Sequence, residues 1–293
     1  MEILLQDLKK AFGKMVAVDI PQFTIHSGDI LGLVGNNGAG KTTLFRLLLD
    51  LIEATEGHVQ MTFDSITHKQ TGQHELSSQE DGSLVVDPAR SETWKKYTGA
   101  YIDEGFLINF LTPEEYLDFI AKVNGMPAID WSKTATTPEH TDDSEATSAH
   151  SESPERDVET TDNTIHPTAQ SISPLLLQFA AGELFGKKKL IRDFSAGNKQ
   201  KIGIIAALYA RPQLLILDEP FNFLDPSSQN LLKRILTQYH AETGATILVS
   251  SHNLQHTIDI STRIALLEHG KIINDLPNTD GSARTALEDY FNV

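Results

Sequence analysis

The stretch DILGLVGNNGAGKTTLFRLLLDLI, residues 29–52, joins an apolar run, a glycine-rich turn and an apolar repeat of helical period. The apolar run at Ile30–Val34 predicts a buried strand, and the repeat after Lys41 predicts a helix. Between them, Gly35-x-x-x-x-Gly40-Lys41-Thr42 has the spacing of a phosphate-binding loop, in the strand-to-helix context that such a loop requires. We therefore expect an α/β fold with a mostly parallel sheet.

The glycines of this loop let successive backbone N–H groups and the helix N-terminus face phosphate groups. We expect Lys41 to reach the β- and γ-phosphates of ATP or GTP, and the hydroxyl of Thr42 to bind Mg²⁺. The predicted nucleotide-binding residues of the loop are Gly35, Asn36, Asn37, Gly38, Ala39, Gly40, Lys41, Thr42 and Thr43. The pattern predicts a P-loop NTPase core; a glycine-rich turn with a chance Lys-Thr pair is the alternative.

Two further apolar runs end in polar side chains that suit the same site. LLILDEP (214–220) ends in Asp218 and Glu219, and ATILVSSH (245–252) ends in His252. The carboxyl ends of parallel strands meet at one edge of a sheet, where ligands bind. We expect Asp218 to hold Mg²⁺, and Glu219 to orient or deprotonate the attacking water. His252 is expected to contact the γ-phosphate; ordinary strand ends and a structural His are the alternatives.

Composition narrows the class of protein. The 293 residues are 40% apolar, which is enough for a sizeable core, and they include no Cys, so disulfides and thiol chemistry are excluded. The net charge of -16 argues against a nucleic-acid partner, because phosphate backbones are bound by clustered Lys and Arg. No apolar run approaches the roughly 20 residues of a membrane span, and the N-terminal sequence lacks the apolar centre of a signal peptide.

Two polar stretches interrupt the pattern. Residues 132–173 are rich in Ser, Thr, Asp and Glu, with nine acidic residues against two basic ones, and predict a disordered acidic insertion. Residues 64–83 predict a polar hairpin loop, because VQMTF (59–63) before it and LVV (84–86) after it have the character of short strands. A solvated spacer and a partner-binding segment are both open interpretations of the two stretches.

The sequence FSAGNKQK (194–201) leads into KIGIIAALYA (201–210), which predicts an amphipathic helix with Ser195 as a candidate N-cap. Together with the phosphate-binding loop and LLILDEP, this segment resembles the nucleotide-binding domain of ABC ATPases, whose signature LSGGQ is similar to FSAGNKQK. The resemblance implies that four signature residues bind the ATP held by a second subunit: Ser195, Ala196, Gly197 and Asn198. Ala196 stands where the family has Gly, and Asn198 where it has Gln.

Other residues match landmarks of this family one by one. The resemblance implies that Phe12 stacks on adenine with Val18 nearby, whereas a core Phe is the alternative from the residues alone. Glu104 takes the place of a Gln that contacts Mg²⁺ and the attacking water, and Asp225 that of an aspartate in a loop at the dimer interface. Phe223 replaces the usual Gly of that loop.

The expected architecture is a single ABC ATPase domain over residues 1–293, with an antiparallel β portion at the front and an inserted helical subdomain at 111–210. The latter begins with a capping box at Thr112–Glu115 and places Tyr116, Ile120 and Val123 on one helix face.

The resemblance implies an ATP-hydrolysing subunit that powers an ABC transporter from the cytoplasmic face of the membrane, as a peripheral protein. The implied ligands are ATP and Mg²⁺. The implied partners are separate transmembrane permease subunits and a second ATPase subunit, which one complete set of motifs per chain predicts to be a second copy in a homodimer. The alternative is an ATP-dependent dimerisation clamp that does not turn over.

Overall fold

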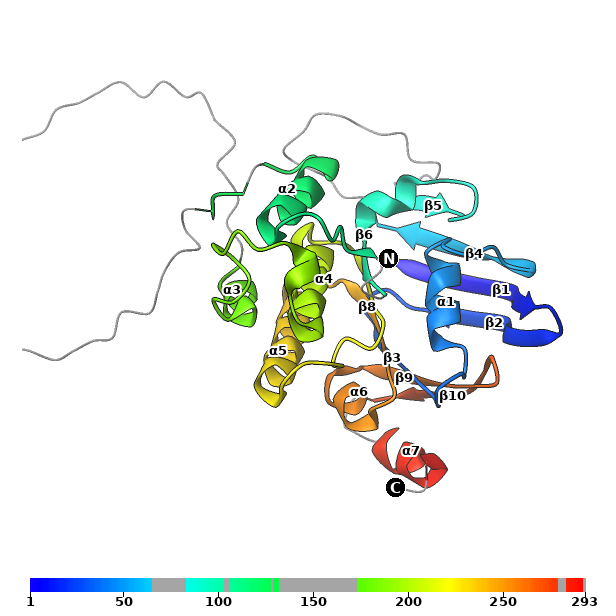
Figure 1. Cartoon of the computed structure of the whole chain (residues 1–293). Helices are drawn as coiled ribbons and strands as arrows, with labels where there is room; N and C mark the ends of the chain where they lie inside the picture. Colours follow the sequence, from blue (N-terminus) through cyan, green and yellow to red (C-terminus); the bar gives the residue numbers. More distant parts are fainter. Residues whose placement is uncertain (65–82, 103–105, 128, 132–172, 279–282, 292–293) are drawn as a thin grey trace, which may run out of the picture.

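A computed structural model describes residues 1–64, 83–102, 106–127, 129–131, 173–278 and 283–291 (Figure 1). Glu104 and nearly all of the two polar stretches, 64–83 and 132–173, lie outside the described residues. The strands are β1 (Glu2–Phe12), β2 (Met15–Ile25), β3 (Ile30–Val34), β4 (Glu56–Phe63), β5 (Leu84–Val86), β6 (Thr98–Tyr101), β7 (Leu214–Leu217), β8 (Thr246–Ser251), β9 (Arg263–Glu268) and β10 (Lys271–Pro277). The helices are α1 (Lys41–Leu48), α2 (Pro113–Val123), α3 (Pro174–Ala180), α4 (Ala196–Tyr209), α5 (Pro226–Thr243), α6 (Leu254–Ile260) and α7 (Ala283–Phe291), with 3-10 turns at Thr93–Tyr97 and Ile191–Asp193.

The central sheet has the strand order β10-β9-β3-β8-β7-β6 and is parallel except for its edge strand β10. The prediction of a mostly parallel α/β core is therefore confirmed. Its inner strands bury both faces: in β7, Leu214 and Ile216 enter one hydrophobic cluster while Leu215 and Leu217 enter another. This explains their uninterrupted apolar sequences, because a strand covered on both sides has no polar face.

A second sheet, of order β2-β1-β4-β5, is antiparallel throughout, as predicted for the front of the chain. The segments VQMTF and LVV lie in β4 and β5 and pair with each other, from Met61–Val86 to Phe63–Leu84. Helix α1 lies between the two sheets (Figure 1), and its Leu44, Phe45 and Leu48 share one cluster with residues of both. The phosphate-binding loop is thus anchored by a helix that is packed on two sides.

Helices α2 to α5 gather on the opposite side of the central sheet (Figure 1) and bury a large apolar cluster against it. The capping box of α2 is confirmed: Glu115 N–H donates to Thr112 Oγ1, and Thr112 N–H donates to Glu115 Oε2. The face predicted to carry Tyr116, Ile120 and Val123 is buried only in part, because Val123 is 67% exposed and Ile120 is half-buried. The buried side chains of α2 are Pro113, Tyr116, Leu117 and Ala121.

Helix α4 also differs from the amphipathic helix that its sequence predicts. Every residue from Gln200 to Tyr209 is buried, because α4 runs between the central sheet and the helices α2 and α3. Gly203 allows this close approach, since a side chain there would meet the ring of Tyr101 on β6. The helix that follows FSAGNKQK is therefore a central element of the fold.

The remaining helices α6 and α7 lie next to each other (Figure 1); α6 contacts β3 and β8, and both helices share an apolar cluster with residues of β3 and β9. The described part of the segment 111–210 contains α2, α3 and α4. In the part of the chain that the structure describes, no helix combines the length and apolarity needed to cross a bilayer.

Candidate nucleotide-binding site

The phosphate-binding loop folds over the side chain of its own lysine. Lys41 is only 7% exposed, and its Nζ donates to the carbonyl oxygen of Gly35 at 2.7 Å. Gly40 has φ +111°, and a side chain there would meet the carbonyl oxygen of Ala17. Only glycine meets both demands, so the loop holds its amides in place by backbone packing. Asn36, Asn37 and Gly38 at its tip are exposed and accessible to a ligand.

A hydroxyl and a carboxylate meet beside the loop. Thr42, at the start of α1, donates from Oγ1 to Oδ2 of Asp218 at 2.6 Å, and Asp218 is 6% exposed at the end of β7. Burial raises the pKa of Asp218, against the hydrogen bonds from Ser250 and Thr42, which lower it. Mg²⁺ takes oxygen ligands such as hydroxyl and carboxylate, so this donor pair fits the metal predicted here.

Glu219 is the second carboxylate of the site and lies next to two basic groups. Its Oε1 is 3.7 Å from Nζ of Lys41, and its Oε2 is 2.8 Å from Nδ1 of His252. The backbone N–H of His252 also donates to Oε2, at 3.2 Å. These contacts arise because β7 and β8 are paired in parallel, so that the residues that follow them emerge side by side. The geometry brings together four predicted residues: Lys41, Asp218, Glu219 and His252.

Two polar residues of the site were not predicted. The hydroxyl of Ser250 in β8 is buried, donates to Oδ1 of Asp218 and accepts the N–H of Glu219 at 2.9 Å. Gln200 in α4 is 2% exposed and donates to the carbonyl oxygen of Glu219 at 3.1 Å. A polar side chain inside the apolar run ATILVSSH was the available signal for Ser250, since a buried hydroxyl needs a partner.

Of Phe12 and Val18, the two residues predicted to lie at the adenine, only Phe12 is exposed. Phe12 is 49% exposed at the end of β1, with Nζ of Lys10 lying 5.1 Å from its ring centre, so the alternative of a core Phe is wrong. Val18 is completely buried and does not present its side chain at the surface. Met15 and Val16, at 63% and 42% exposure, are the apolar neighbours on the adjoining strand.

The signature segment begins α4. Ser195 is its N-cap and accepts the N–H of Asn198 at 3.4 Å, while the Asn198 amide donates to Oε2 of Glu183. The backbone of Ala196 does not have a positive φ, so its side chain causes no strain of the left-handed kind. Gly197 lies against the carbonyl oxygen of Phe223. Within the described residues, no hydrogen bond joins Ser195 or Asn198 to the phosphate-binding loop of the same chain.

Asp225 caps the next helix. It accepts the backbone N–H groups and the hydroxyls of Ser227 and Ser228 at the start of α5. The hydrogen bonds from Ser228 and Ser227 hold the pKa of Asp225 well below its usual range. Two residues earlier, Phe223 is 72% exposed with φ +59°, a conformation that favours glycine.

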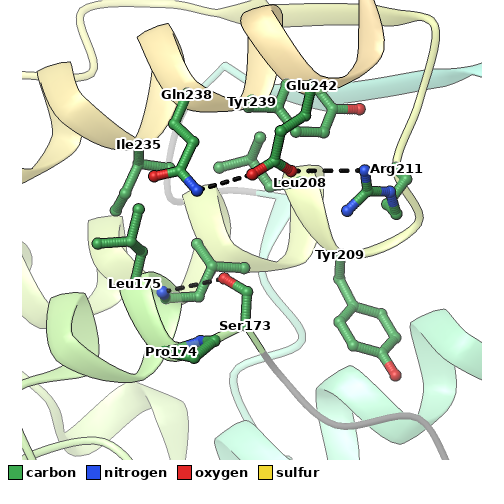
Figure 2. Close-up of a pocket in the computed structure, with 11 residues that line it drawn as sticks. Ser173, Pro174, Leu175, Leu208, Tyr209, Arg211, Ile235, Gln238, Tyr239 and Glu242 are labelled. Carbon is green, nitrogen blue, oxygen red and sulfur yellow. Dashed lines mark hydrogen bonds and ion pairs between the residues drawn. The ribbon is translucent and has the colours of Figure 1, made fainter.

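A separate cavity of about 290 Å³ lies between α3, α5 and the C-terminal end of α4 (Figure 2). Leu175, Leu208 and Ile235 line it, and the Arg211–Glu242 ion pair of 3.6 Å lies at its edge. None of the predicted site residues lines this cavity, so it is distinct from the nucleotide-binding site.

Comparisons with known proteins agree with this geometry. A family model described as ABC transporter matches residues 18–222. The chain is 29% identical over 276 residues to the bacitracin transport ATP-binding protein BcrA of Bacillus licheniformis, covering 92% of this chain and 68% of that protein. It is 27% identical over 288 residues to the lantibiotic transport ATP-binding protein SrtF of Streptococcus pyogenes, covering 98% and 95%.

Solved structures show the same fold. The structure of an ATP-binding subunit of an ABC transporter has a TM-score of 0.67 at 22% identity, covering 98% of this chain and 94% of that one. The dimeric post-hydrolysis cassette MJ0796, bound to ADP and Pi, has a TM-score of 0.63 at 17% identity, covering 94% and 98%. Because the family match begins before the phosphate-binding loop and ends after Glu219, the chain belongs to the ABC transporter family, as one of its ATP-binding, ATP-hydrolysing subunits.

Proposed function

We propose that two copies of this chain close over two ATP molecules and, through separate membrane subunits, drive transport. The observation that carries the proposal is the convergence of Lys41, Asp218, Glu219 and His252, from a loop and two strand ends, on one site. Each of these side chains has a distinct task in ATP hydrolysis. The tasks follow from the geometry and from general chemistry.

The substrate is bound by the loop and by the front sheet. Exposed Phe12 stacks on adenine, and the amides of residues 35–43, together with the N-terminus of α1, surround the phosphates. Lys41 exchanges its contact with the Gly35 carbonyl for the phosphate oxygens. Thr42 and Asp218 would hold Mg²⁺, which when bound would offset the negative charge of the phosphates.

Glu219 acts as the general base that takes a proton from the attacking water. His252 holds the carboxylate from one side through Nδ1, which leaves its other ring nitrogen free to face the γ-phosphate. Lys41 lies on the other side of the same carboxylate, at 3.7 Å. The carboxylate of Glu219 thus lies between two groups that can hold it by charge or by a hydrogen bond.

The subunit that completes each ATP site is another copy of this chain. The N-terminal turn of α4 lies at the surface, with Ser195 exposed and residues 196–198 half-buried, and its helix dipole favours an anion supplied from outside. Asp225 and Phe223 lie next to that turn, since Gly197 touches the backbone of Phe223. A homodimer with two complete sites needs no further subunit for ATP binding, and the solved cassette MJ0796 is itself dimeric.

The membrane subunits dock on an aromatic surface, which we define as Phe106, Phe110, Phe119 and Val123. These side chains are 49%, 71%, 45% and 67% exposed, on α2 and the loop before it. That loop is joined to the segment before the signature, because the N–H groups of Ile191 and Arg192 donate to the carbonyls of Leu111 and Asn109. A force on this surface therefore reaches α4. The relatives are named as transport proteins, which supports membrane partners and a site of action at the cytoplasmic face of the membrane.

Phosphate release by the purified chain tests the enzymatic core of the proposal. The wild type should hydrolyse ATP in the presence of Mg²⁺, and Glu219→Gln should lower kcat by about 100-fold because the base is lost. The control is His26→Ala, which changes an exposed histidine outside the site and should keep the wild-type kcat, unlike His252→Ala. A wild type that binds ATP without hydrolysing it would instead identify a dimerisation clamp.

A further inference from the structure

Glu219 has a backbone conformation that its side chain disfavours. Its φ is +48°, in the left-handed region where non-glycine residues are uncommon. Such a residue keeps this conformation only when its surroundings hold it, and strained residues of this kind are found at functional sites.

Two buried side chains from different elements hold its backbone. On one side, Oγ of Ser250 in β8 accepts the N–H of Glu219 at 2.9 Å. On the other side, Nε2 of Gln200 in α4 donates to the carbonyl oxygen of Glu219 at 3.1 Å. Both side chains are almost fully buried, at 0% and 2% exposure, so water does not compete for these bonds.

We propose that Ser250 and Gln200 are positioning residues that clamp the backbone of Glu219 and so aim its carboxylate at the attacking water. The inference rests on the proposed role of Glu219 as general base. The clamp explains how a strained residue keeps its side chain between Lys41 and His252. Both side chains are buried and bond to Glu219 or Asp218, so each acts through these two residues.

The two halves of the clamp connect the base to different parts of the site. The same Ser250 hydroxyl donates to Asp218, so the proposed Mg²⁺ ligand and the base are held by one group. Gln200 lies in the second turn of α4, whose first turn carries the signature residues. A second copy that binds the signature turn would therefore act on the helix that holds the Glu219 carbonyl.

Variants that remove one bond each test the clamp. Ser250→Ala and Gln200→Met should each lower kcat for ATP hydrolysis by about tenfold. The affinity for a fluorescent ATP analogue without Mg²⁺ should stay within about twofold, because both side chains are buried and bond to Glu219 or Asp218. Ser250→Thr keeps the hydroxyl and should recover most of the lost kcat. The control is Thr246→Val in the same strand, which removes a buried hydroxyl that accepts from Gly28 and donates to Met1.

Hydrogen exchange measured without nucleotide gives a readout that is independent of hydrolysis. The amide of Glu219 should exchange faster in Ser250→Ala than in the wild type, and at the wild-type rate in Thr246→Val. Unchanged exchange at Glu219, or an unchanged kcat in both Ser250→Ala and Gln200→Met, would overturn the inference. A wild type without ATPase activity would overturn the proposed function and the catalytic role of the clamp, while exchange would still decide whether Ser250 holds the amide.

Discussion

The hydroxyl of Thr42 donates a 2.6 Å hydrogen bond to the carboxylate of Asp218, across a sequence separation of 176 residues. This bond joins the helix after the phosphate-binding loop to the end of β7. It places side by side the two oxygen atoms that we propose as ligands for Mg²⁺.

Thr42→Val should therefore weaken Mg²⁺-dependent ATP binding by about tenfold or more, because it removes one of the two oxygens while keeping the shape of the side chain. Fluorescent ATP titrations at several Mg²⁺ concentrations measure the effect. Thr42→Ser keeps the hydroxyl and serves as the matched control. Equal Mg²⁺ dependence in Thr42→Val and the wild type would show that Thr42 is not a ligand.

Phe110→Glu should lower the association of the chain with membranes by about tenfold or more, because it places a charge on the most exposed member of the aromatic surface. Its ATP affinity and free energy of unfolding should stay near those of the wild type, since Phe110 is 71% exposed. Pelleting of membranes from cells that produce the chain and its transporter measures the association. Ile273→Glu on β10, also an exposed apolar residue at 42%, is the control and should still pellet. Loss in both variants would point to a nonspecific effect of charge.

Phe223→Gly should raise the free energy of unfolding by about 1 kcal/mol, because φ is +59° and glycine adopts this conformation without a steric cost. Urea unfolding measures the change. Phe110→Gly is the matched control: the two side chains are 72% and 71% exposed, yet Phe110 has no left-handed backbone. It should not be stabilised. A destabilised Phe223→Gly would mean that the exposed ring contributes packing within the chain.

Arg263→Met should lower the free energy of unfolding by about 3 kcal/mol, because Arg263 is 16% exposed and pairs with Asp29 and Asp275. Its guanidinium also donates to the carbonyl of Thr24 in β2, which joins the two sheets. The control Arg284→Met, at 42% exposure, should cost less than about 1 kcal/mol in the same urea experiment. Similar values for the two variants would refute the structural role of Arg263.

The sequence was sufficient where local pattern determines local structure. Glycine spacing and an apolar run before Lys41 predicted the loop between β3 and α1, and Thr112 with Glu115 predicted the capped start of α2. Strand-end residues Asp218 and His252 could be placed together because parallel strands end at one edge of the sheet. In each case a general rule of local structure or of sheet geometry was enough.

The features of the fold and site that were not predicted depend on packing between distant elements. Val123 was predicted to share a helix face with Tyr116 and Ile120, but contact with α4 decides which side of α2 is buried. For the same reason, α4 has no polar face. Gln200 was not predicted because its partner, the carbonyl of Glu219, is a backbone group that carries no sequence signal. Val18 looked like a neighbour of Phe12, yet the alternation of side chains along β2 buries it.

The central claim is that two copies of this chain close over ATP. Light scattering after size-exclusion chromatography of Glu219→Gln, with and without ATP and Mg²⁺, tests it most directly, since loss of the base should preserve bound ATP. We expect a dimer only with ATP and Mg²⁺, and a monomer when Ser195→Arg is added, because the signature turn would then be blocked. A monomer of Glu219→Gln under all conditions, with ATP bound, would contradict the account.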